Sequence, residues 1–281
     1  MAETFFVQGS QRAARVQDLF GRIASRYDLI NDLQSLGLHR FWKARVLKLA
    51  RAQPGERALD ICCGTGDLAV GLTRHGAKVV GLDFSEPMLG IAQSRVQSPE
   101  SKVQSPKSVV SSQWSAVSSG AGAAPTTDYG LRTTDYELSN PCFIRADAQH
   151  LPFAKNSFDI VTIGYGLRNL ADWEAGLREM TRVARHGGRL VVLDFGKPNN
   201  ALWRGLYFGY LKLFVPMLGR LLCGDAAAYA YILESLKHYP AQNGVSEKMR
   251  QMGLASVRII TLFGGAMSIN YGEKKSGVSS P

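Results

Sequence analysis

The chain contains few cysteines and histidines, so it offers little material for disulfides or metal sites. Four cysteines occur in 281 residues, none at C-x-x-C spacing, and the five histidines are scattered along the chain. This usage is typical of reduced thiols in a cytoplasmic protein rather than of a disulfide framework or a zinc site. We therefore expect a cytoplasmic protein without a metal ion.

Long uninterrupted hydrophobic runs are also missing. The first fifteen residues include an early acid and no apolar core, which predicts neither a signal peptide nor an anchor. The most apolar segment, residues 201–222, is interrupted by Arg204, Lys212 and Arg220, and Pro216 should break or kink a helix there. A membrane span is disfavoured. Two alternatives remain: a buried or lid helix pair, or an apolar, basic surface that meets a membrane or a lipid tail.

Acidic residues are in deficit relative to basic ones. The chain has 23 Asp and Glu against 33 Lys and Arg, and its formal net charge is +10. Such a balance fits nucleic acid or an anionic membrane surface, and charge alone does not choose between them. With 45% hydrophobic residues, the chain can bury the core of one large α/β domain.

A glycine turn after a short apolar strand is the most informative local pattern. The strand carries Asp60 and is followed by Gly64, Thr65 and Gly66. Glycine lets backbone approach a ligand and adopts positive φ at low cost, so the turn predicts a nucleotide-cofactor site. The third glycine of a dinucleotide fingerprint is absent, although Ala69 in its place keeps NAD open. The acid before the turn favours S-adenosylmethionine (SAM), whose amino group and sulfonium suit nearby carboxylates.

Alternating strands and helices predict a parallel sheet with helices on both faces. In such sheets, ligands bind at the carboxyl ends of the strands. Polar side chains fall at or near five predicted strand ends, namely Asp60, Asp83, Asp147, residues 165–169 and Asp194. Asp83, at the end of the second strand, is placed to accept hydrogen bonds from both hydroxyls of an adenosine ribose.

Glycine also marks a predicted helix end later in the chain. We predict a helix over residues 171–185, stopped by Gly187 and Gly188, and then a strand over residues 189–193. Towards the C-terminus, residues 226–253 are predicted to be helical. The two apolar runs that follow them predict a closing hairpin, residues 257–262 with 266–271.

Residues 97–140 interrupt this pattern. The segment contains ten serines and two tandem seven-residue echoes, and it cannot bury enough apolar surface to fold. We predict a low-complexity, disordered insertion. The chain is therefore divided into an N-terminal helical segment (1–51), an α/β domain (52–273) that contains the insertion, and a flexible tail (274–281).

The N-terminal segment holds an unusual density of polar and aromatic side chains between residues 27 and 43, among them Tyr27 and His39. One interpretation is a capped helical entry with a solvated face. The other, which we adopt for residues 1–51, is a lid that folds over the cofactor.

Five motifs together resemble one family. They are YDLINDLQSLGLHRFWK, LDICCGTGDLA, ADAQHLPF, GYGLRNL and the REMTRVARHGG run that leads to LDFGKP. They resemble the UbiE/MenG family of SAM-dependent C-methyltransferases of menaquinone and ubiquinone biosynthesis. The resemblance covers about residues 15–96 and 142–273. The chain departs from the family pattern at Ile30, His186, Asp194 and Gly196, and the last two are expected beside the acceptor pocket.

The resemblance implies a Rossmann-like, seven-stranded sheet whose last strand is antiparallel. It also implies SAM as the methyl donor and S-adenosylhomocysteine (SAH) as the product. Together with the glycine turn, it predicts a donor site formed by Asp60, Gly64, Thr65, Gly66, Asp83, Asp147, Ala148 and Gly164.

The resemblance implies C-methylation of a polyprenylated quinol. Demethylmenaquinol is the substrate that we expect first, and a benzoquinol is the second candidate. A ring carbon becomes nucleophilic when a ring hydroxyl loses its proton, so the site needs a base or a positive group. Arg168 and Asn169 are the first catalytic candidates. Tyr27 and His39 follow if the lid closes over the site. The competing interpretation of Arg168 is a surface ion pair with Asp172.

Other functions are compatible with parts of this pattern. An RNA methyltransferase would also explain the basic charge, but GYGLRN stands where base-amino methyltransferases usually carry N-P-P-[YF]. Another small-molecule acceptor, a NAD oxidoreductase and an inactive SAM-binding regulator complete the alternatives. We expect a polyprenyl quinol substrate, peripheral contact with anionic lipid on the inner face of the membrane and no nucleic acid partner, and we leave a homodimer open.

Overall fold

A twisted sheet of seven strands forms the centre of the computed structural model, which describes residues 10–97, 140–223 and 227–276. The strands are β1 (Arg57–Ile61), β2 (Lys78–Asp83), β3 (Cys142–Arg145), β4 (Phe158–Gly164), β5 (Ala184–Phe195), β6 (Ala255–Leu262) and β7 (Met267–Glu273). Their order across the sheet is β3-β2-β1-β4-β5-β7-β6. Neighbours pair in parallel except β7, which runs antiparallel to β5 and β6. The predicted fold class, including the antiparallel last strand and the closing hairpin, is confirmed.

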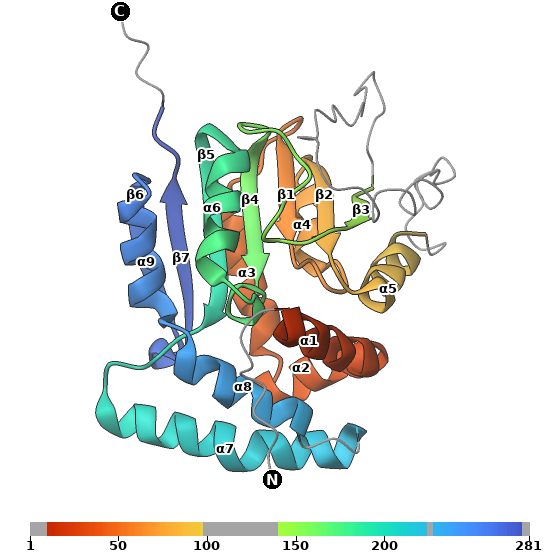
Figure 1. Cartoon of the computed structure of the whole chain (residues 1–281), viewed down its shortest axis with the longest axis vertical. Coiled ribbons are helices and arrows are strands. Elements are labelled where there is room, and N and C mark those ends of the chain that lie inside the picture. The colour runs from red at the N-terminus through yellow and green to blue at the C-terminus, as the bar shows by residue number, and fades with distance from the viewer. Residues whose placement is uncertain (1–9, 98–139, 224–226, 277–281) are drawn as a thin grey trace, which may run out of the picture.

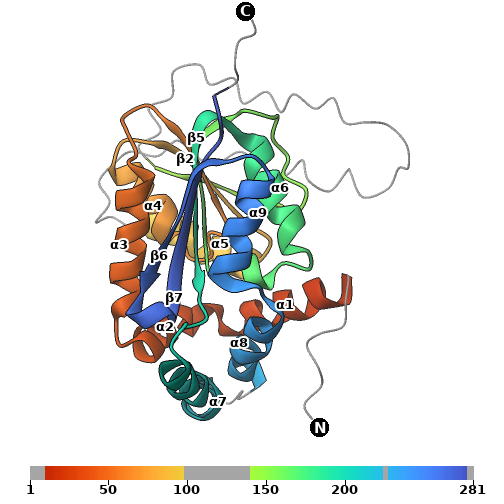
Figure 2. The same ribbon diagram turned by 90° about the vertical axis from the view of Figure 1, so that its left-hand side faces the viewer.

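Helices cover both faces of the sheet and one of its ends. They are α1 (Ser10–Ile23), α2 (Tyr27–Ser35), α3 (Leu38–Ala50), α4 (Asp67–Arg74), α5 (Glu86–Gln97), α6 (Trp173–Val183), α7 (Ala201–Cys223), α8 (Ala227–His238) and α9 (Ala241–Gln251), with short 3-10 turns η1 (Ala24–Arg26), η3 (Leu167–Asn169) and η4 (Phe263–Gly265). Figure 2 shows α3 and α4 on one side of the sheet and α6 and α9 on the other. Helices α1, α2, α7 and α8 gather at the end where the parallel strands terminate (Figure 1).

Successive residues of a strand point to opposite sides of the sheet. Because successive residues in the central strands are apolar, both faces of the sheet are apolar. In β5, Leu190 and Val192 join the buried cluster that α6 and α9 cover. Val191 and Leu193 join the second cluster, which α3 and α4 cover. Each fully buried aliphatic side chain contributes about 1.5–3 kcal/mol. The strand therefore reads as a continuous apolar run, which is the pattern that identified it.

The predicted helix stop at the glycine pair is wrong. α6 ends at Val183 because Ala184 is already extended, with φ −63° and ψ 135°. The glycine pair lies inside β5 instead. Gly187 N–H donates to the Lys274 carbonyl (2.8 Å), and Lys274 N–H donates to the Gly188 carbonyl (2.9 Å). These bonds to a residue far along the chain hold the pair in the sheet.

Of the two predicted effects of Pro216, a break is wrong, since α7 runs through it as one helix, and a kink stays a prediction. Proline cannot donate to the carbonyl four residues earlier, which belongs to Lys212. Lys212 is exposed, so water can supply the missing hydrogen bond. On another face of α7, Tyr207, Leu211 and Val215 recur every fourth residue and are buried against the body of the protein.

The predicted insertion falls almost wholly outside the described residues, which resume at Asn140 after Gln97. Its disorder stays a prediction, as does the division of the chain at residues 51 and 273.

Candidate active site

Two cavities adjoin at the carboxyl ends of the parallel strands. The smaller one, of about 220 Å³, is lined by the ends of β1, β2 and β4. The larger one, of about 570 Å³, lies among α1, α2, α3, α7 and α8. Phe20, Tyr27 and Tyr165 line both cavities. These three side chains therefore form the partition between the two spaces.

Five of the eight predicted donor contacts line the smaller cavity: Gly64, Asp83, Asp147, Ala148 and Gly164. The carboxylate of Asp83 accepts hydrogen bonds from the backbone N–H groups of Gly64 and Ser85, both at 2.9 Å. Burial raises the pKa of Asp83, and these backbone donors oppose that shift. Each carboxylate oxygen has a second lone pair, so the side chain can still accept hydrogen bonds from a ligand's hydroxyl groups.

The other three residues predicted to contact the donor do not line the smaller cavity. Asp60 is buried and accepts a hydrogen bond from the Thr162 hydroxyl at 2.7 Å. Thr65 is also buried, and its hydroxyl donates to Asp28 at 3.0 Å. Gly66, with φ +85°, precedes the first residue of α4. The predicted contact of these three residues with a donor therefore stays a prediction.

The turn that follows β4 carries the predicted catalytic pair. Tyr165 adopts a left-handed backbone conformation, φ +61°, which is strained for a residue with a bulky side chain. Its carbonyl accepts hydrogen bonds from Arg168 Nη1 (2.6 Å) and Asn169 Nδ2 (3.0 Å). The two polar side chains therefore stabilise the turn that places the Tyr165 ring between the cavities. Arg168 lines the larger cavity and Asn169 the smaller one.

Arg168 forms a buried ion pair with Asp194 at the end of β5. Arg168 Nη1 donates to Asp194 Oδ1 at 2.9 Å, and the two side chains are 5% and 3% exposed. The Arg168 backbone N–H donates to Asp194 Oδ2 at 3.1 Å. The guanidinium carbon lies 4.6 Å from the centre of the Phe195 ring. Burial raises the pKa of Asp194, and the positive charge of Arg168 opposes the rise.

The predicted alternative, a surface ion pair between Arg168 and Asp172, is wrong. Asp172 instead caps α6 by accepting a hydrogen bond from the Ala175 N–H at 2.9 Å. Its other oxygen pairs with exposed Arg178 at 3.2 Å.

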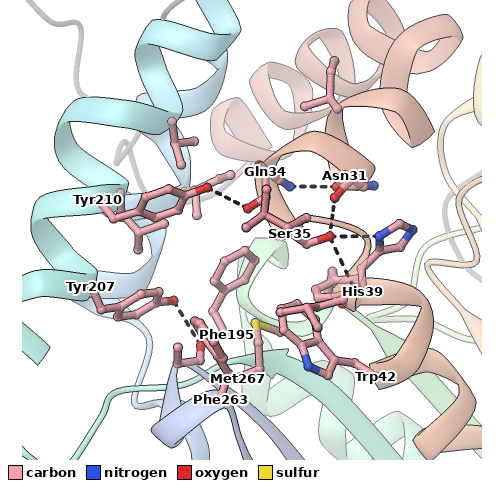
Figure 3. A pocket seen from close by; sticks show the side chains of 18 of the residues that line it. Asn31, Gln34, Ser35, His39, Trp42, Phe195, Tyr207, Tyr210, Phe263 and Met267 are labelled. Carbon is pink, nitrogen blue, oxygen red and sulfur yellow. Dashed lines mark hydrogen bonds between the residues drawn. The ribbon is translucent and has the colours of Figure 1, made fainter. Parts of the chain in front are cut away.

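The two second-rank candidates, Tyr27 and His39, both line the larger cavity. Burial raises the pKa of the Tyr27 hydroxyl. Burial lowers the pKa of His39, which favours the neutral ring, and its Nδ1 lies 3.0 Å from the Ser35 hydroxyl (Figure 3). Of the two, only Tyr27 also reaches the smaller cavity.

The rest of the larger cavity is mainly apolar, with a polar spot on α2. Its apolar wall includes Leu19, Ile23, Ile30, Leu211, Val215 and Ile232. Gln34 Nε2 donates to Asn31 Oδ1 at 2.8 Å on the α2 side (Figure 3). The site residues predicted from the sequence do not include Asn31, Gln34 or the partition residue Phe20. The polar density of residues 27–43 was the only signal for the first two.

The comparisons with known proteins agree with one another. The model of the ubiE/COQ5 methyltransferase family matches residues 8–139 and 128–274. The chain is 35% identical over 271 residues to the ubiquinone/menaquinone biosynthesis C-methyltransferase UbiE of Azotobacter vinelandii, covering 95% of this chain and 93% of that one. It is 36% identical over 269 residues to the demethylmenaquinone methyltransferase of Desulfitobacterium hafniense, covering 95% and 92%.

A solved SAM-dependent methyltransferase of Thermotoga maritima has a similar fold, with a TM-score of 0.56 and 18% identity, and the match covers 92% of this chain and 99% of that one. At this identity the likeness shows the fold alone.

We expect Asp60→Asn to change how stability depends on pH. Burial raises the pKa of Asp60 from its ordinary 3.8 to about 7. Between these values the folded state binds more protons than the unfolded state, so the free energy of unfolding falls as pH rises. An amide cannot ionise. The free energy of unfolding of the variant, relative to that of the wild type, should therefore rise by up to about 1.4 kcal/mol per pH unit over this range. Above the range the difference should stay constant. Urea unfolding across the range measures the difference, and a pH-independent difference would contradict the assignment.

Proposed function

Since the chain belongs to the ubiE/COQ5 methyltransferase family and is a SAM-dependent C-methyltransferase, we propose that its acceptor is a polyprenylated quinol. The names of both relatives refer to menaquinone or to demethylmenaquinone, whereas only one of the two names refers to ubiquinone. Demethylmenaquinol is therefore the acceptor that we propose first, and a polyprenyl benzoquinol is the second.

One observation carries the proposal: the two cavities differ in chemistry and share a thin partition. The larger cavity has a volume within the usual range for organic ligands and a mainly apolar lining. Such a lining suits an aromatic ring with a hydrocarbon tail and supports a quinol over RNA. The smaller cavity combines the glycine turn with Asp83, which suits an adenosine ribose. Phe20, Tyr27 and Tyr165 stand where the two ligands would meet.

The residues of the smaller cavity fit SAM, which supplies an electrophilic methyl group on a sulfonium. Gly64 has φ +54°, and no atom would lie within 4 Å of a Cβ placed there, so open space faces its backbone. The Asp83 carboxylate would accept the ribose hydroxyls, and Asp147 with Ala148 would border the adenine. Gly164 would lie near the methionine part.

The protein's share of the chemistry is to align the reactants, exclude water and stabilise charge. Alignment of reactants can supply about 7–11 kcal/mol of the barrier. We assign charge stabilisation to Arg168, whose guanidinium would face the phenolate that forms when a ring hydroxyl loses its proton. A water on the guanidinium would carry that proton away. Asp194 and Phe195 would keep the guanidinium in place.

We assign the lid predicted for residues 1–51 to α1 and α2. Val16, Phe20 and Tyr27 line the smaller cavity from this segment. The same segment gives the larger cavity much of one wall. A lid in this position would shield both ligands from water.

We further propose that the enzyme works at an anionic membrane surface. The large hydrophobic side chains that are exposed, among those described, all lie on α2, α3, α7, η4 or the α2–α3 turn: Leu29, Leu33, Leu36, Leu38, Phe41, Leu202, Leu206, Leu213, Phe214, Met217 and Phe263. Leu36, Leu206 and Phe214 also line the larger cavity, so its mouth opens among them. An apolar patch of this kind suits a partner surface.

The charge of α7 supports the same proposal. This helix carries Arg204, Lys212 and Arg220 and no acidic residue. A basic residue near an anionic bilayer contributes about 1 kcal/mol to binding. In the described part of the chain, no helix combines the length and apolarity that crossing a membrane requires.

The acceptor is tested by mass spectrometry with SAM and two reduced short-tail acceptors, demethylmenaquinol and 2-methoxy-6-prenyl-1,4-benzoquinol. We expect a product heavier by one methylene unit from demethylmenaquinol, and the ratio of the two products ranks the acceptors. No product from either quinol, with SAH binding intact, would refute a quinol acceptor.

We expect the double variant Arg168→Gln/Asp194→Asn to keep SAH binding and to lose turnover by about a hundredfold or more. Both residues are changed because removing Arg168 alone would leave a buried unpaired charge, at a cost of about 3–5 kcal/mol. The exposed ion pair changed in the same way, Arg178→Gln/Asp172→Asn, is the control and should retain turnover. Isothermal titration and steady-state rates provide the comparison. Equal rates in the two double variants would exclude a catalytic role for Arg168.

For membrane contact, we expect Leu202→Glu/Leu213→Glu to reduce partitioning onto anionic vesicles by roughly tenfold or more, because it removes apolar surface and adds two negative charges. Neither side chain lines either of the two cavities described above, so turnover of a short-tail acceptor in solution should persist. Gln93→Glu/Gln251→Glu adds the same charge at two exposed positions on α5 and α9 and should partition nearly as the wild type does. Vesicle flotation measures all three proteins, and equal flotation would count against this surface.

A further inference from the structure

Helix α2 belongs to both cavities. Tyr27, its first residue, lines both of them, while Ile30, Asn31 and Gln34 line the larger one. A shift of this helix would therefore open the smaller cavity and change the shape of the larger one at once. What holds α2 in place then matters for both ligands.

Asp28 connects α2 directly to the glycine turn. Its Oδ1 accepts a hydrogen bond at 3.0 Å from the hydroxyl of Thr65, which stands between the two glycines. Its Oδ2 forms an ion pair with Arg95 of α5. The Asp28 and Arg95 side chains are 34% and 36% exposed, so salt in the solvent can screen this pair.

Arg95 contacts the same turn from the other side. Its Nη1 donates to the Thr65 carbonyl at 3.1 Å and to Asp67 Oδ1 at 2.7 Å. The second oxygen of Asp67 pairs with Lys43 of α3. The two acids and two cations thus join α2, α3, α4 and α5 around Thr65, and Asp28 is the member that α2 contributes.

The far end of α2 is fastened separately. The Tyr210 hydroxyl of α7 donates to the Gln34 carbonyl at 2.7 Å (Figure 3). One end of the helix is therefore held by the glycine turn and the other by α7, which carries the exposed apolar surface.

We propose that Asp28 is a positioning residue that fastens α2 over the donor and so couples retention of the donor to formation of the acceptor cavity. With the tie intact, Tyr27 stays over the smaller cavity and the α2 wall of the larger cavity stays in place. Without it, the donor dissociates faster and the acceptor binds more weakly, while the Arg168 turn is untouched. The inference rests on the proposed function in one respect, namely that the smaller cavity holds SAM or SAH.

The test is the dissociation rate of SAH from the full-length protein, measured by stopped-flow displacement. SAH is used because it lacks the sulfonium charge of SAM. Asp28→Ala should release SAH about tenfold faster or more, because it loses a charge-assisted tie and a hydrogen bond. Asp18→Ala, which removes the exposed Asp18–Arg22 pair of α1, is the matched control and should change the rate by less than about twofold.

Salt dependence separates a charged tie from general loosening of the fold. Wild-type SAH release should quicken as sodium chloride screens the Asp28–Arg95 pair, whereas Asp28→Ala should show little salt dependence. Asp28→Asn keeps an oxygen for Thr65 but not the charge, so its low-salt rate should lie between the other two. In steady state, KM for SAM and for the acceptor should rise more than kcat falls.

Unchanged SAH release in both Asp28 variants overturns the proposal, and so does equal acceleration in Asp18→Ala. Failure of the proposed function would look different. A wild-type protein that binds no SAH refutes the donor site itself. A wild-type protein that binds SAH but methylates no quinol refutes only the acceptor, and the dissociation rates still decide the role of Asp28.

Discussion

The buried ion pair of Arg168 and Asp194 is the contact on which the arrangement of both cavities depends. It joins the ends of β4 and β5, and the same guanidinium nitrogen that meets Asp194 also bonds the carbonyl of Tyr165. Removing two charges from water costs several kcal/mol per ion, so such a pair is weak evidence for stability. Its effect here is positional. It fixes a left-handed turn, and that turn holds an aromatic ring between the spaces for the two ligands.

The positions of the parallel strands follow from patterns that are local in the chain. Short apolar runs identify β1, which carries Asp60 near its end, β2, which ends at Asp83, and β4, which ends at Gly164, because a strand buried on both faces needs little else. The errors arose where distant residues decide local structure. Gly187 and Gly188 resemble a helix stop in the local sequence, but the hydrogen bonds between their backbone and Lys274 place them in a strand. Pro216 resembles a helix break in the local sequence, but packing of α7 on the body of the protein keeps the helix continuous.

The site shows the same division. Asp83, Gly64 and Gly164 could be located because strand ends and glycine turns define where a cofactor approaches. The partner of Arg168 could not be located from the sequence. Asp172 is only four residues away in sequence, whereas Asp194 becomes a neighbour of Arg168 only through the pairing of β4 with β5. The wall of the larger cavity was equally hidden, since α2 and α7 are separated by most of the chain.

The larger cavity is built mainly by helices that lie outside the sheet, α1, α2, α3, α7 and α8. The sheet contributes little more than strand ends such as Phe195 and Met267. The glycine turn and Asp83 line the smaller cavity, to which neither α7 nor α8 contributes a residue. An engineer seeking a new acceptor would therefore begin with side chains of α7 and α8 that face the larger cavity, and would leave α1 and α2, which also line the smaller cavity, unchanged.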